Sequence, residues 1–331
     1  MANQKKIDWS KTRILLTGGT GSFGRKFTEI MLRKYRPAVL RIFSRDELKQ
    51  SEMIKEYGEH PGLRFFIGDV RDYGRLRRAM ENVDIVVHAA ALKQVPLCEY
   101  NPFEAIHTNI LGAENVINAA LDLNVKKVVA ISTDKAVAPV NLYGATKMCM
   151  EKLFVSANSY VGRDRDTRMI CVRYGNVIGS RGSVVPLFQN QKKDGRITVT
   201  HPDMTRFWIT LEQGVNFVIR CIGMMKGGEI FIPKIPSMKI LDLAEAVAPG
   251  SGIKYTGVRP GEKVHESLLS EDESRHALEF EDFFTVEPES PSWNYQPRSG
   301  GKKLPEGFCY RSDTNRCCLT PGQLGKMLEK A

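Results

Sequence analysis

The chain of 331 residues is 42% hydrophobic and 26% charged, an ordinary globular composition with enough apolar residues for a large core. No run approaches the roughly eighteen apolar residues of a membrane span and the polar N-terminus is unlike a signal peptide, so we expect a cytoplasmic protein outside the membrane. The net charge of +10 is dispersed without a basic run, which argues against nucleic-acid binding. Two explanations of the excess charge stay open, a pocket for anionic ligands and a plain basic surface.

The cysteines and histidines suggest neither disulfides nor a metal centre. The seven cysteines have no paired spacing apart from the adjacent Cys317 and Cys318, as expected of reduced cytosolic thiols. None of them combines with the six histidines into a ligand spacing, so the sequence predicts no metal site.

Short apolar runs alternate with helical segments through the first half of the chain. The runs lie at residues 14–16, 39–43, 64–67, 84–88, 127–131 and 169–174, and helices are predicted at 24–35 and 111–123. This alternation is typical of parallel strands buried on both faces. We therefore predict an α/β fold with a Rossmann-type, doubly wound parallel sheet.

Loop residues become more frequent after Gly175, which predicts a smaller C-terminal lobe. A helix at 211–225 is followed by a strand, a turn and another helix within 227–248. Residues 281–305 are rich in Pro, Ser and acidic residues, and we expect them to extend over the surface. The predicted division is a Rossmann domain at 1–175 and a lobe at 176–331, with some segments of the lobe returning to the Rossmann domain.

A glycine-rich turn directly follows the first predicted strand. Gly18, Gly21 and Gly24 have the spacing G-x-x-G-x-x-G and open the first helix. Such glycines permit a tight turn, let the backbone approach a pyrophosphate and allow close packing of helix on strand. The helix N-terminus then offers N–H groups to the phosphates. The residues expected to hold a dinucleotide here are Gly18, Thr20, Gly21, Ser22, Phe23 and Gly24.

The end of the second strand bears on which dinucleotide binds. Ser44 and Arg45 stand where NAD enzymes usually place a carboxylate, and Lys49 lies a turn further on. A hydroxyl and a guanidinium suit a 2′-phosphate, which favours NADP. Asp46 keeps NAD open, although it equally suits a cap of the next helix. The remaining expected cofactor contacts are Glu47, Asp69, Val70, Ala89, Ala90, Ala91, Lys93, Thr108 and Asn109.

Tyr143 and Lys147 form Tyr-x-x-x-Lys and share one face of a predicted helix. A phenol with a pKa near 10 is a poor base at neutral pH. A neighbouring ammonium and an oxidised nicotinamide both favour the phenolate, so the pair becomes a usable base. Since the motif follows the fifth strand and Thr133, the pattern predicts a catalytic centre that also contacts the cofactor.

These motifs together resemble the extended short-chain dehydrogenase/reductases, and among them the configuration-inverting UDP-N-acetylglucosamine 4,6-dehydratases of the pseudaminic acid pathway. The stretches that carry the resemblance include LLTGGTGSFG, HAAALKQVPLCEYNP, STDKAVAPVNLYGATK and RYGNVIGSRGSVVP. The resemblance covers almost the whole chain and weakens beyond Glu281. It implies a hydro-lyase that takes UDP-N-acetylglucosamine as its substrate and forms a homo-oligomer, either a dimer or a hexamer.

The resemblance also implies roles for the residues around Thr133. Retaining dehydratases carry Asp-Glu where this chain has Asp134 and Lys135. Tyr143, aided by Thr133, would take the proton of the sugar 4-hydroxyl, and Asp134 and Lys135 would divide the elimination of water between them. The sequence leaves open which of the two acts at which step. As a base, Lys135 would need a lowered pKa, which we expect burial near the nicotinamide and Lys147 to supply.

Further residues are expected at the sugar nucleotide by the same resemblance. Arginines suit a diphosphate and a carboxylate suits a hydroxyl. The expected substrate contacts are Lys93, Lys135, Asn176, Val177, Arg181, Thr205, Arg259 and Glu262. We expect Arg206 and Lys263 to be exposed, and Phe207 and Trp208 to belong to the core instead of stacking on uracil.

Three other functions stay open. A nucleotide-sugar epimerase would use Tyr143 and Lys147 without needing Asp134 and Lys135. A bifunctional dehydratase and 5-epimerase is the second. A non-catalytic NADP sensor on the same fold would not need Tyr143, which this chain has.

Overall fold

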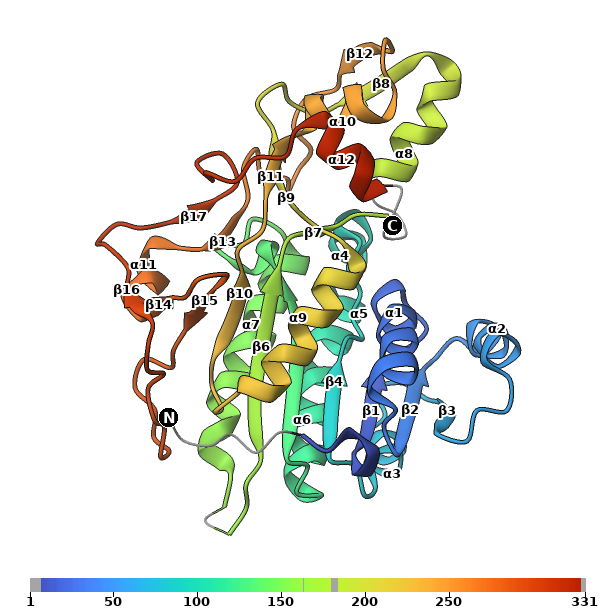
Figure 1. Ribbon diagram of the computed structural model, residues 1–331, viewed down its shortest axis with the longest axis vertical. Helices are drawn as coiled ribbons and strands as arrows, with labels where there is room; N and C mark the ends of the chain where they lie inside the picture. The colour runs from blue at the N-terminus through green and yellow to red at the C-terminus, as the bar shows by residue number, and fades with distance from the viewer. Residues whose placement is uncertain (1–6, 163, 180–183, 329–331) are drawn as a thin grey trace.

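The computed structural model describes residues 7–162, 164–179 and 184–328. A central sheet carries helices on both faces, and a smaller lobe lies beyond one end of its strands (Figure 1). The sheet in these ranges has ten strands, which are, in spatial order, β16 (Lys302–Lys303), β14 (Ala277–Glu279), β15 (Phe283–Val286), β10 (Ile230–Pro233), β6 (Arg168–Tyr174), β5 (Lys127–Thr133), β4 (Ile85–His88), β1 (Arg13–Thr17), β2 (Val39–Ser44) and β3 (Leu63–Ile67).

The strands from β10 to β3 are parallel, whereas the pairings of β15, β14 and β16 beyond β10 are antiparallel. β10 pairs parallel with β6 and antiparallel with β15, which in turn pairs antiparallel with β14. The Val- and Ile-rich runs of β4, β5 and β6 are almost entirely buried, as strands covered on both faces must be. The predicted doubly wound parallel sheet is therefore confirmed.

Helices cover the two faces of the sheet. α1 (Ser22–Ile30) packs against α9 (Leu211–Met224) on one face, and α3 (Tyr73–Met80), α6 (Gly112–Asp122) and α7 (Leu142–Ser156) pack together on the other (Figure 1). The predicted helices at 24–35, 111–123 and 211–225 are confirmed to within two residues, the first ending in a π-helical turn. The shorter and connecting helices are η1 (Trp9–Lys11), η2 (Met31–Tyr35), α2 (Glu47–Tyr57), α4 (Val95–Tyr100), α5 (Pro102–Ile106), η3 (His107–Leu111), η4 (Asp134–Ala136) and η5 (Ala157–Tyr160).

The smaller lobe has its own apolar cluster, which includes Phe188, Leu243 and the fully buried Trp208. Phe207 is also fully buried, so the prediction that Phe207 and Trp208 belong to the core is confirmed. Besides α9, the elements beyond β6 that lie outside the large sheet are β7 (Asn176–Val177), α8 (Val184–Gln191), η6 (Lys192–Asp194), β8 (Arg196–Val199), β9 (Thr205–Ile209), β11 (Ser237–Lys239), α10 (Ile240–Val247), β12 (Gly252–Tyr255), β13 (Ser267–Leu269), α11 (Glu271–Ser274), β17 (Tyr310–Arg311) and α12 (Pro321–Leu328).

The prediction that residues 281–305 extend over the surface is wrong for Phe283–Val286. These four residues form the buried strand β15, which lies between β10 and β14 in the large sheet. Two aromatic and two β-branched residues in a row favour a strand. The Pro, Ser and acidic residues around them masked that signal.

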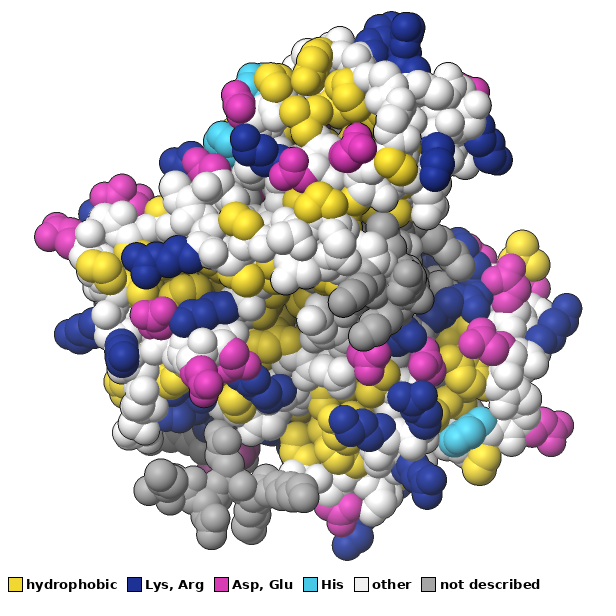
Figure 2. Space-filling model, turned by 45° about the horizontal axis from the view of Figure 1, so that its top comes forward, with side chains coloured by type: hydrophobic (Ala, Val, Ile, Leu, Met, Phe, Trp, Pro, Cys, Tyr) yellow, Lys and Arg dark blue, Asp and Glu magenta, His cyan; other side chains and the backbone are white. Residues whose placement is uncertain are grey.

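Charged side chains are dispersed over the surface. Figure 2 shows Lys and Arg interspersed with Asp and Glu on the visible face, with no continuous basic stripe there. Among the residues that the structure describes, no helix combines the length and the apolar character needed to cross a membrane.

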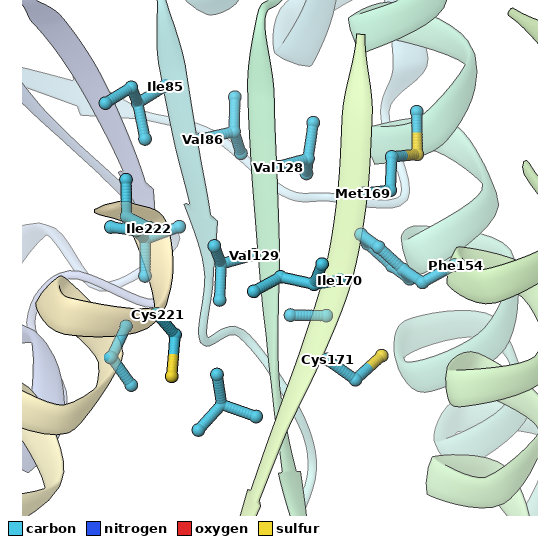
Figure 3. Close-up of a cluster of buried hydrophobic side chains, with 14 of the residues drawn as sticks. Ile85, Val86, Val128, Val129, Phe154, Met169, Ile170, Cys171, Cys221 and Ile222 are labelled. Carbon is cyan, nitrogen blue, oxygen red and sulfur yellow. The ribbon is translucent and has the colours of Figure 1, made fainter. Parts of the chain in front are cut away.

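Side chains on both faces of the central strands pack against the flanking helices. Figure 3 shows Val129 of β5 and Ile170 of β6 between Ile222 of α9 on one side and Phe154 of α7 on the other. These side chains are buried, and burying each one contributes about 1.5–3 kcal/mol. The packing holds α7 rigidly against the sheet.

A buried ion network ties α7 to the C-terminal part of the chain. The Arg173 guanidinium on β6 donates to both Glu151 oxygens on α7, at 2.9 and 2.6 Å from Nε and Nη2, and to Glu273 on α11 at 2.8 and 3.0 Å. Arg173 is 1% exposed, and a bidentate guanidinium–carboxylate pair has a fixed geometry. The network therefore fixes the position of α7 relative to the segment around β13.

Candidate active site

A cleft of ≈ 700 Å³ opens at the carboxyl ends of the parallel strands. The predicted site residues that line it are Gly18, Thr20, Gly21, Ser22, Phe23, Ser44, Arg45, Asp46, Lys49, Asp69, Val70, Ala89, Ala90, Ala91, Lys93, Thr108, Thr133, Lys135, Tyr143, Lys147, Asn176 and Val177. The cleft thus brings together most of the cofactor set and the reactive end of the substrate set.

The glycine turn between β1 and α1 forms one wall of the cleft. Gly18 has φ +66°, and a Cβ added there would lie 2.8 Å from the backbone of Ala89 and Ala90. Gly24 lies outside the cleft lining. A Cβ there would lie 2.3 Å from the Gly19 backbone, so the glycine allows α1 to pack closely against the turn. These glycines leave α1 with its N-terminal N–H groups at the cleft, which fits a pyrophosphate.

The region expected to hold the adenosine end is crossed by several hydrogen bonds. Ser44 Oγ accepts from Thr20 Oγ1 at 3.2 Å and from Gln50 Nε2 at 3.1 Å. Arg45 is half-exposed and its Nη1 lies 3.4 Å from Asp69 Oδ2. Burial would raise the pKa of Asp69, but hydrogen bonds from Arg71 and the nearby charges of Arg45 and Arg71 hold it below the ordinary value.

Asp46 caps α2 and also lines the cleft. Its Oδ1 accepts from the Lys49 backbone N–H at 3.0 Å, and its carboxylate pairs with the Lys49 ammonium. The capping alternative is therefore confirmed. Glu47, the next residue, is exposed and lies outside the cleft lining.

Two buried hydroxyl groups in the middle of the cleft fit a bound polar ligand. Thr108 Oγ1 and Ser132 Oγ line the cleft and have no hydrogen-bond partner within the described ranges. Buried polar atoms are nearly always hydrogen-bonded in native proteins, so both hydroxyl groups are suited to a hydrogen bond with a ligand in the cleft. Asn109 instead lies behind the wall, where its amide bonds the Leu92 backbone at 2.8 and 2.9 Å and Thr146 Oγ1 at 3.0 Å.

The predicted catalytic residues meet where β5 runs into η4 and α7 begins. The Asn141 side chain accepts from the Gly144 N–H at 2.8 Å and starts α7 there, which places Tyr143 in its first turn. The Thr133 side chain lies next to the Tyr143 phenol and lowers the pKa of that phenol. Thr133 Oγ1 donates to Asp134 Oδ1 at 2.9 Å. Tyr143 therefore lies beside the residues expected to carry out the elimination.

Tyr143 is not an intrinsically acidic phenol in this structure. Burial raises the pKa of Tyr143 to about 12, against the lowering effects of the Lys135 ammonium and the Thr133 side chain. Burial also lowers the pKa of Lys147 to about 8. Lys147 Nζ has Met150 Sδ as a neighbour at 3.0 Å.

The prediction that Lys135 has a lowered pKa is wrong. Burial alone would lower the pKa of Lys135, but the carboxylates of Asp134 and Glu266 outweigh burial and raise that pKa above its ordinary value. Lys135 Nζ lies 3.0 Å from Asp134 Oδ1 and 3.4 Å from Glu266 Oε1. Lys135 is therefore an ammonium at neutral pH.

The two charges at the catalytic end differ in exposure. Asp134 is fully buried and absent from the cleft lining, and its Oδ2 has no hydrogen-bond partner among the described residues. Lys135 lines the cleft, and its Nζ reaches Asn176 Oδ1 at 3.5 Å. Lys135 is thus the member of the pair that faces the cleft.

Three predicted substrate residues lie away from the cleft. Thr205 Oγ1 bonds His265 Nδ1 at 2.9 Å and Ser312 Oγ at 2.7 Å. Arg259 is exposed, and Glu262 Oε1 lies 3.6 Å from Arg206 Nη2. A fourth, Arg181, lies outside the described residues.

The expectation that Arg206 and Lys263 are exposed is wrong. Arg206 is 6% exposed and donates to the backbone carbonyls of Thr205, Lys263 and Val264 at 2.7–3.0 Å. Lys263 Nζ donates to the Val137 carbonyl oxygen at 2.6 Å. Lys263 thus ties the C-terminal lobe to the segment that follows Lys135, whereas Arg206 joins two segments of the lobe to each other.

Other residues of the site were missed by sequence reasoning. Most of the missed residues in the cleft lining are next to predicted site residues or at the ends of predicted strands and helices, and this position could have identified them. The missed lining residues are Phe43, Gly68, Gln94, Ile131, Ser132, Tyr174, Gly175, Val184 and Leu211. Glu266 carries no local signal, because its partner Lys135 is far away in the sequence.

Comparisons with known proteins agree with this geometry. A family model described as polysaccharide biosynthesis protein matches residues 14–288. The chain is 51% identical over 319 residues to UDP-N-acetylglucosamine 4,6-dehydratase (inverting) of Campylobacter jejuni, covering 93% of this chain and 94% of that protein. It is 46% identical over 292 residues to UDP-glucose 4-epimerase of Rickettsia canadensis, covering 85% and 84%. The X-ray structure of Pen from Bacillus thuringiensis matches with a TM-score of 0.88 and 40% identity over 98% of this chain and 100% of that one.

The glycine turn can be tested directly. Gly18→Ala forces a side chain into a left-handed backbone and against the Ala89 backbone, so we expect weaker dinucleotide binding and a lower melting temperature. Gly21→Ala, whose Cβ meets only the Gly18 carbonyl oxygen at 3.3 Å, is the milder second variant. Gly223→Ala on α9 meets nothing within 4 Å and is the matched control. Fluorescence titration and thermal unfolding measure both effects, and wild-type binding by Gly18→Ala would contradict this assignment.

Proposed function

The chain belongs to the polysaccharide biosynthesis protein family and has the extended short-chain dehydrogenase/reductase fold, and we propose that it is an inverting UDP-N-acetylglucosamine 4,6-dehydratase. The single observation that carries the proposal is the cluster of Tyr143, Thr133, Asp134 and Lys135 at one end of a dinucleotide-sized cleft. A plain dehydrogenase needs the first two of these residues, whereas the elimination of water also needs a proton donor and a proton acceptor.

Tyr143 removes the proton of the sugar 4-hydroxyl. The raised pKa of the buried phenol opposes this step, and the Lys135 ammonium assists it. A bound nicotinamide supplies the hydride acceptor for carbon 4 and later the hydride donor for carbon 6. Its positive charge also favours the phenolate.

Asp134 and Lys135 together accept and donate the protons that move at the sugar during the elimination. Their resting state is an ion pair, with a carboxylate and an ammonium whose atoms lie 3.0 Å apart. One proton acceptor and one proton donor thus stand side by side next to Tyr143. The ketone at carbon 4 acidifies carbon 5, and loss of the carbon-5 proton and of the 6-hydroxyl as water leaves a double bond between carbons 5 and 6. Return of the hydride to carbon 6 and protonation of carbon 5 on the opposite face then give UDP-4-keto-6-deoxy-L-hexosamine with carbon 5 inverted.

We assign NADP as the cofactor. Arg45, Ser44 and Lys49 gather at the end of β2, where a ribose 2′-phosphate would lie. Arg45 is half-exposed, and a 2′-phosphate would compete with Asp69, whose Oδ2 lies 3.4 Å from Arg45 Nη1, for a bidentate contact with its guanidinium. The main counter-argument, the Asp46 carboxylate, is weakened because that group caps α2 and pairs with Lys49.

The product is suited to the synthesis of surface glycans or flagellin sugars of the pseudaminic acid type, and we place the reaction in the cytoplasm. The described structure contains the seven cysteines as free thiols, as a reducing compartment would keep them.

A UDP-sugar 4-epimerase is the second candidate, because one relative at 46% identity carries that name. An epimerase returns the hydride to carbon 4 and leaves the 6-hydroxyl in place. Asp134 and Lys135 have no task in that reaction, which is why we place the dehydratase first.

We further propose that two copies of the chain pair through the face formed by α4 and α5. Leu97, Tyr100 and Phe103 are 62, 85 and 73% exposed there, next to α7. A patch of large exposed apolar side chains marks an interaction surface, and a twofold dimer buries the same patch on both copies.

Turnover of UDP-N-acetylglucosamine tests the proposed reaction. The wild-type protein with NADP should yield a product lighter by one water, and Tyr143→Phe should lower kcat by roughly 10²–10⁴-fold because the base is lost. The exposed Tyr160→Phe is the matched control and should keep full activity. Mass spectrometry reads the product, and a product of unchanged mass would favour the epimerase.

Cofactor choice has its own variant. Arg45→Ala should raise the Kd for NADP about 10- to 100-fold, since a charge-assisted hydrogen bond contributes about 1.5–3 kcal/mol, and should leave the Kd for NAD unchanged. Lys55→Ala, exposed on α2, is the control. Calorimetric titration with both cofactors measures this, and equal affinities of the wild-type protein for NAD and NADP would refute the assignment.

Dimerisation is tested by placing a charge on the patch. Tyr100→Glu should give a monomer in light scattering, because a carboxylate at a twofold interface meets its own copy or apolar surface. Ile54→Glu, at a partly exposed position on α2, should keep the wild-type mass. A Tyr100→Glu variant of unchanged mass would place the interface elsewhere.

A further inference from the structure

Glu266 is a buried carboxylate beside the catalytic cluster. It immediately precedes β13 and is 2% exposed. Its Oε1 lies 3.4 Å from Lys135 Nζ, and its Oε2 lies 3.8 Å from Lys263 Nζ without a hydrogen-bond partner in the described ranges. A buried carboxylate at this distance from an ammonium is a strong electrostatic neighbour, because the surrounding protein screens far less than water.

The C-terminal part of the chain fixes the position of Glu266. Its backbone N–H donates to Ser312 Oγ at 3.0 Å, and its carbonyl oxygen accepts from the Ser312 N–H at 2.9 Å. Ser312 Oγ in turn lies 2.7 Å from Thr205 Oγ1. Thr205, which was expected to touch the substrate, thus belongs to the frame that holds Glu266.

Lys135 faces charges from several elements. Asp134 lies next to it on η4, Glu266 and Lys263 face it from the segment before β13, and Arg206 faces it from β9. Lys93, after β4, and Tyr143, on α7, complete the set. The nearest charges are the two carboxylates, at 3.0 and 3.4 Å, and Arg206 is turned toward backbone carbonyls.

We propose that Glu266 is a positioning residue of the active site that shares the Lys135 ammonium with Asp134 and holds it at the cleft beside Asn176. Glu266 is absent from the cleft lining, so it acts through Lys135 and forms no bond to the substrate. Because a second carboxylate favours the charged form of a lysine, the enzyme meets its substrate with Lys135 protonated. The proposal deepens the proposed function and rests on it.

The test uses the full-length protein with a neutral isostere. Glu266→Gln should let Lys135 lose its proton at lower pH, since one of its two carboxylates is gone. Competitive labelling of lysines with acetic anhydride, read by peptide mass spectrometry, follows this without any turnover. Acetylation of Lys135 relative to the exposed Lys55 should begin at lower pH in Glu266→Gln than in the wild-type protein.

Activity provides the second readout. In Glu266→Gln, kcat should fall about 10- to 100-fold, the effect of losing a buried charged contact of about 1.5–3 kcal/mol, while KM changes little. In the pH profile of kcat/KM, the fall at alkaline pH should begin at lower pH, because Lys135 loses its proton earlier. Glu266→Asp retains the carboxylate and should restore the wild-type profile.

Glu273→Gln separates this effect from a loss of stability. Glu273 pairs with Arg173 away from the cleft, so its variant should melt at a lower temperature without moving the labelling curve of Lys135. A Glu266→Gln curve identical to wild type, or an equal shift in Glu273→Gln, would overturn the proposal. Absence of product with the wild-type protein would instead count against the proposed function and leave the labelling result standing.

Discussion

The carboxyl ends of neighbouring parallel strands must lie at one edge of a sheet, and this constraint assembles the whole cleft. β1, β4, β5 and β6 are adjacent, and the last residues pair within β1 and β4, Thr17 with His88, and within β5 and β6, Thr133 with Tyr174. His88 itself pairs with Ala130, so β5 and β6 run on past the end of β4. The segments that follow therefore emerge together and bring the glycine turn, the three alanines, Asp134 and Lys135 to one place.

The charges buried around the catalytic end of the cleft then determine the protonation states of its lysines. Lys147 and Lys135 both belong to the catalytic end, yet the pKa of Lys147 is lowered to about 8 by burial whereas that of Lys135 is raised. The difference lies in their neighbours, because two carboxylates face Lys135 and a methionine sulfur faces Lys147. Similar lysines thus acquire different protonation behaviour within one cleft, which is how a single site can hold both an electrostatic helper and a proton-transfer group.

The parts of the site that the sequence predicts depend on short-range patterns. The glycine spacing after a strand and the four-residue separation of Tyr143 and Lys147 are local, and Gly18, Gly21, Tyr143 and Lys147 line the cleft. The fold followed from the alternation of apolar runs and helices for the same reason.

What the sequence could not predict depends on contacts between distant segments. The raised pKa of Lys135 requires Glu266, which is placed by Ser312 near the end of the chain. The burial of Arg206 and the strand at Phe283–Val286 likewise depend on which segments of the lobe fold back onto the sheet. Composition alone made these residues look like solvent-facing ones.

Proton exchange at carbon 5 of the sugar tests the central claim most directly. In deuterated water, with UDP-N-acetylglucosamine as substrate, the account predicts a 4-keto-6-deoxy product that carries one solvent deuteron at carbon 5 in the inverted configuration, as seen by proton NMR. A product that keeps its original hydrogen at carbon 5, or that differs from the substrate only at carbon 4, would contradict it.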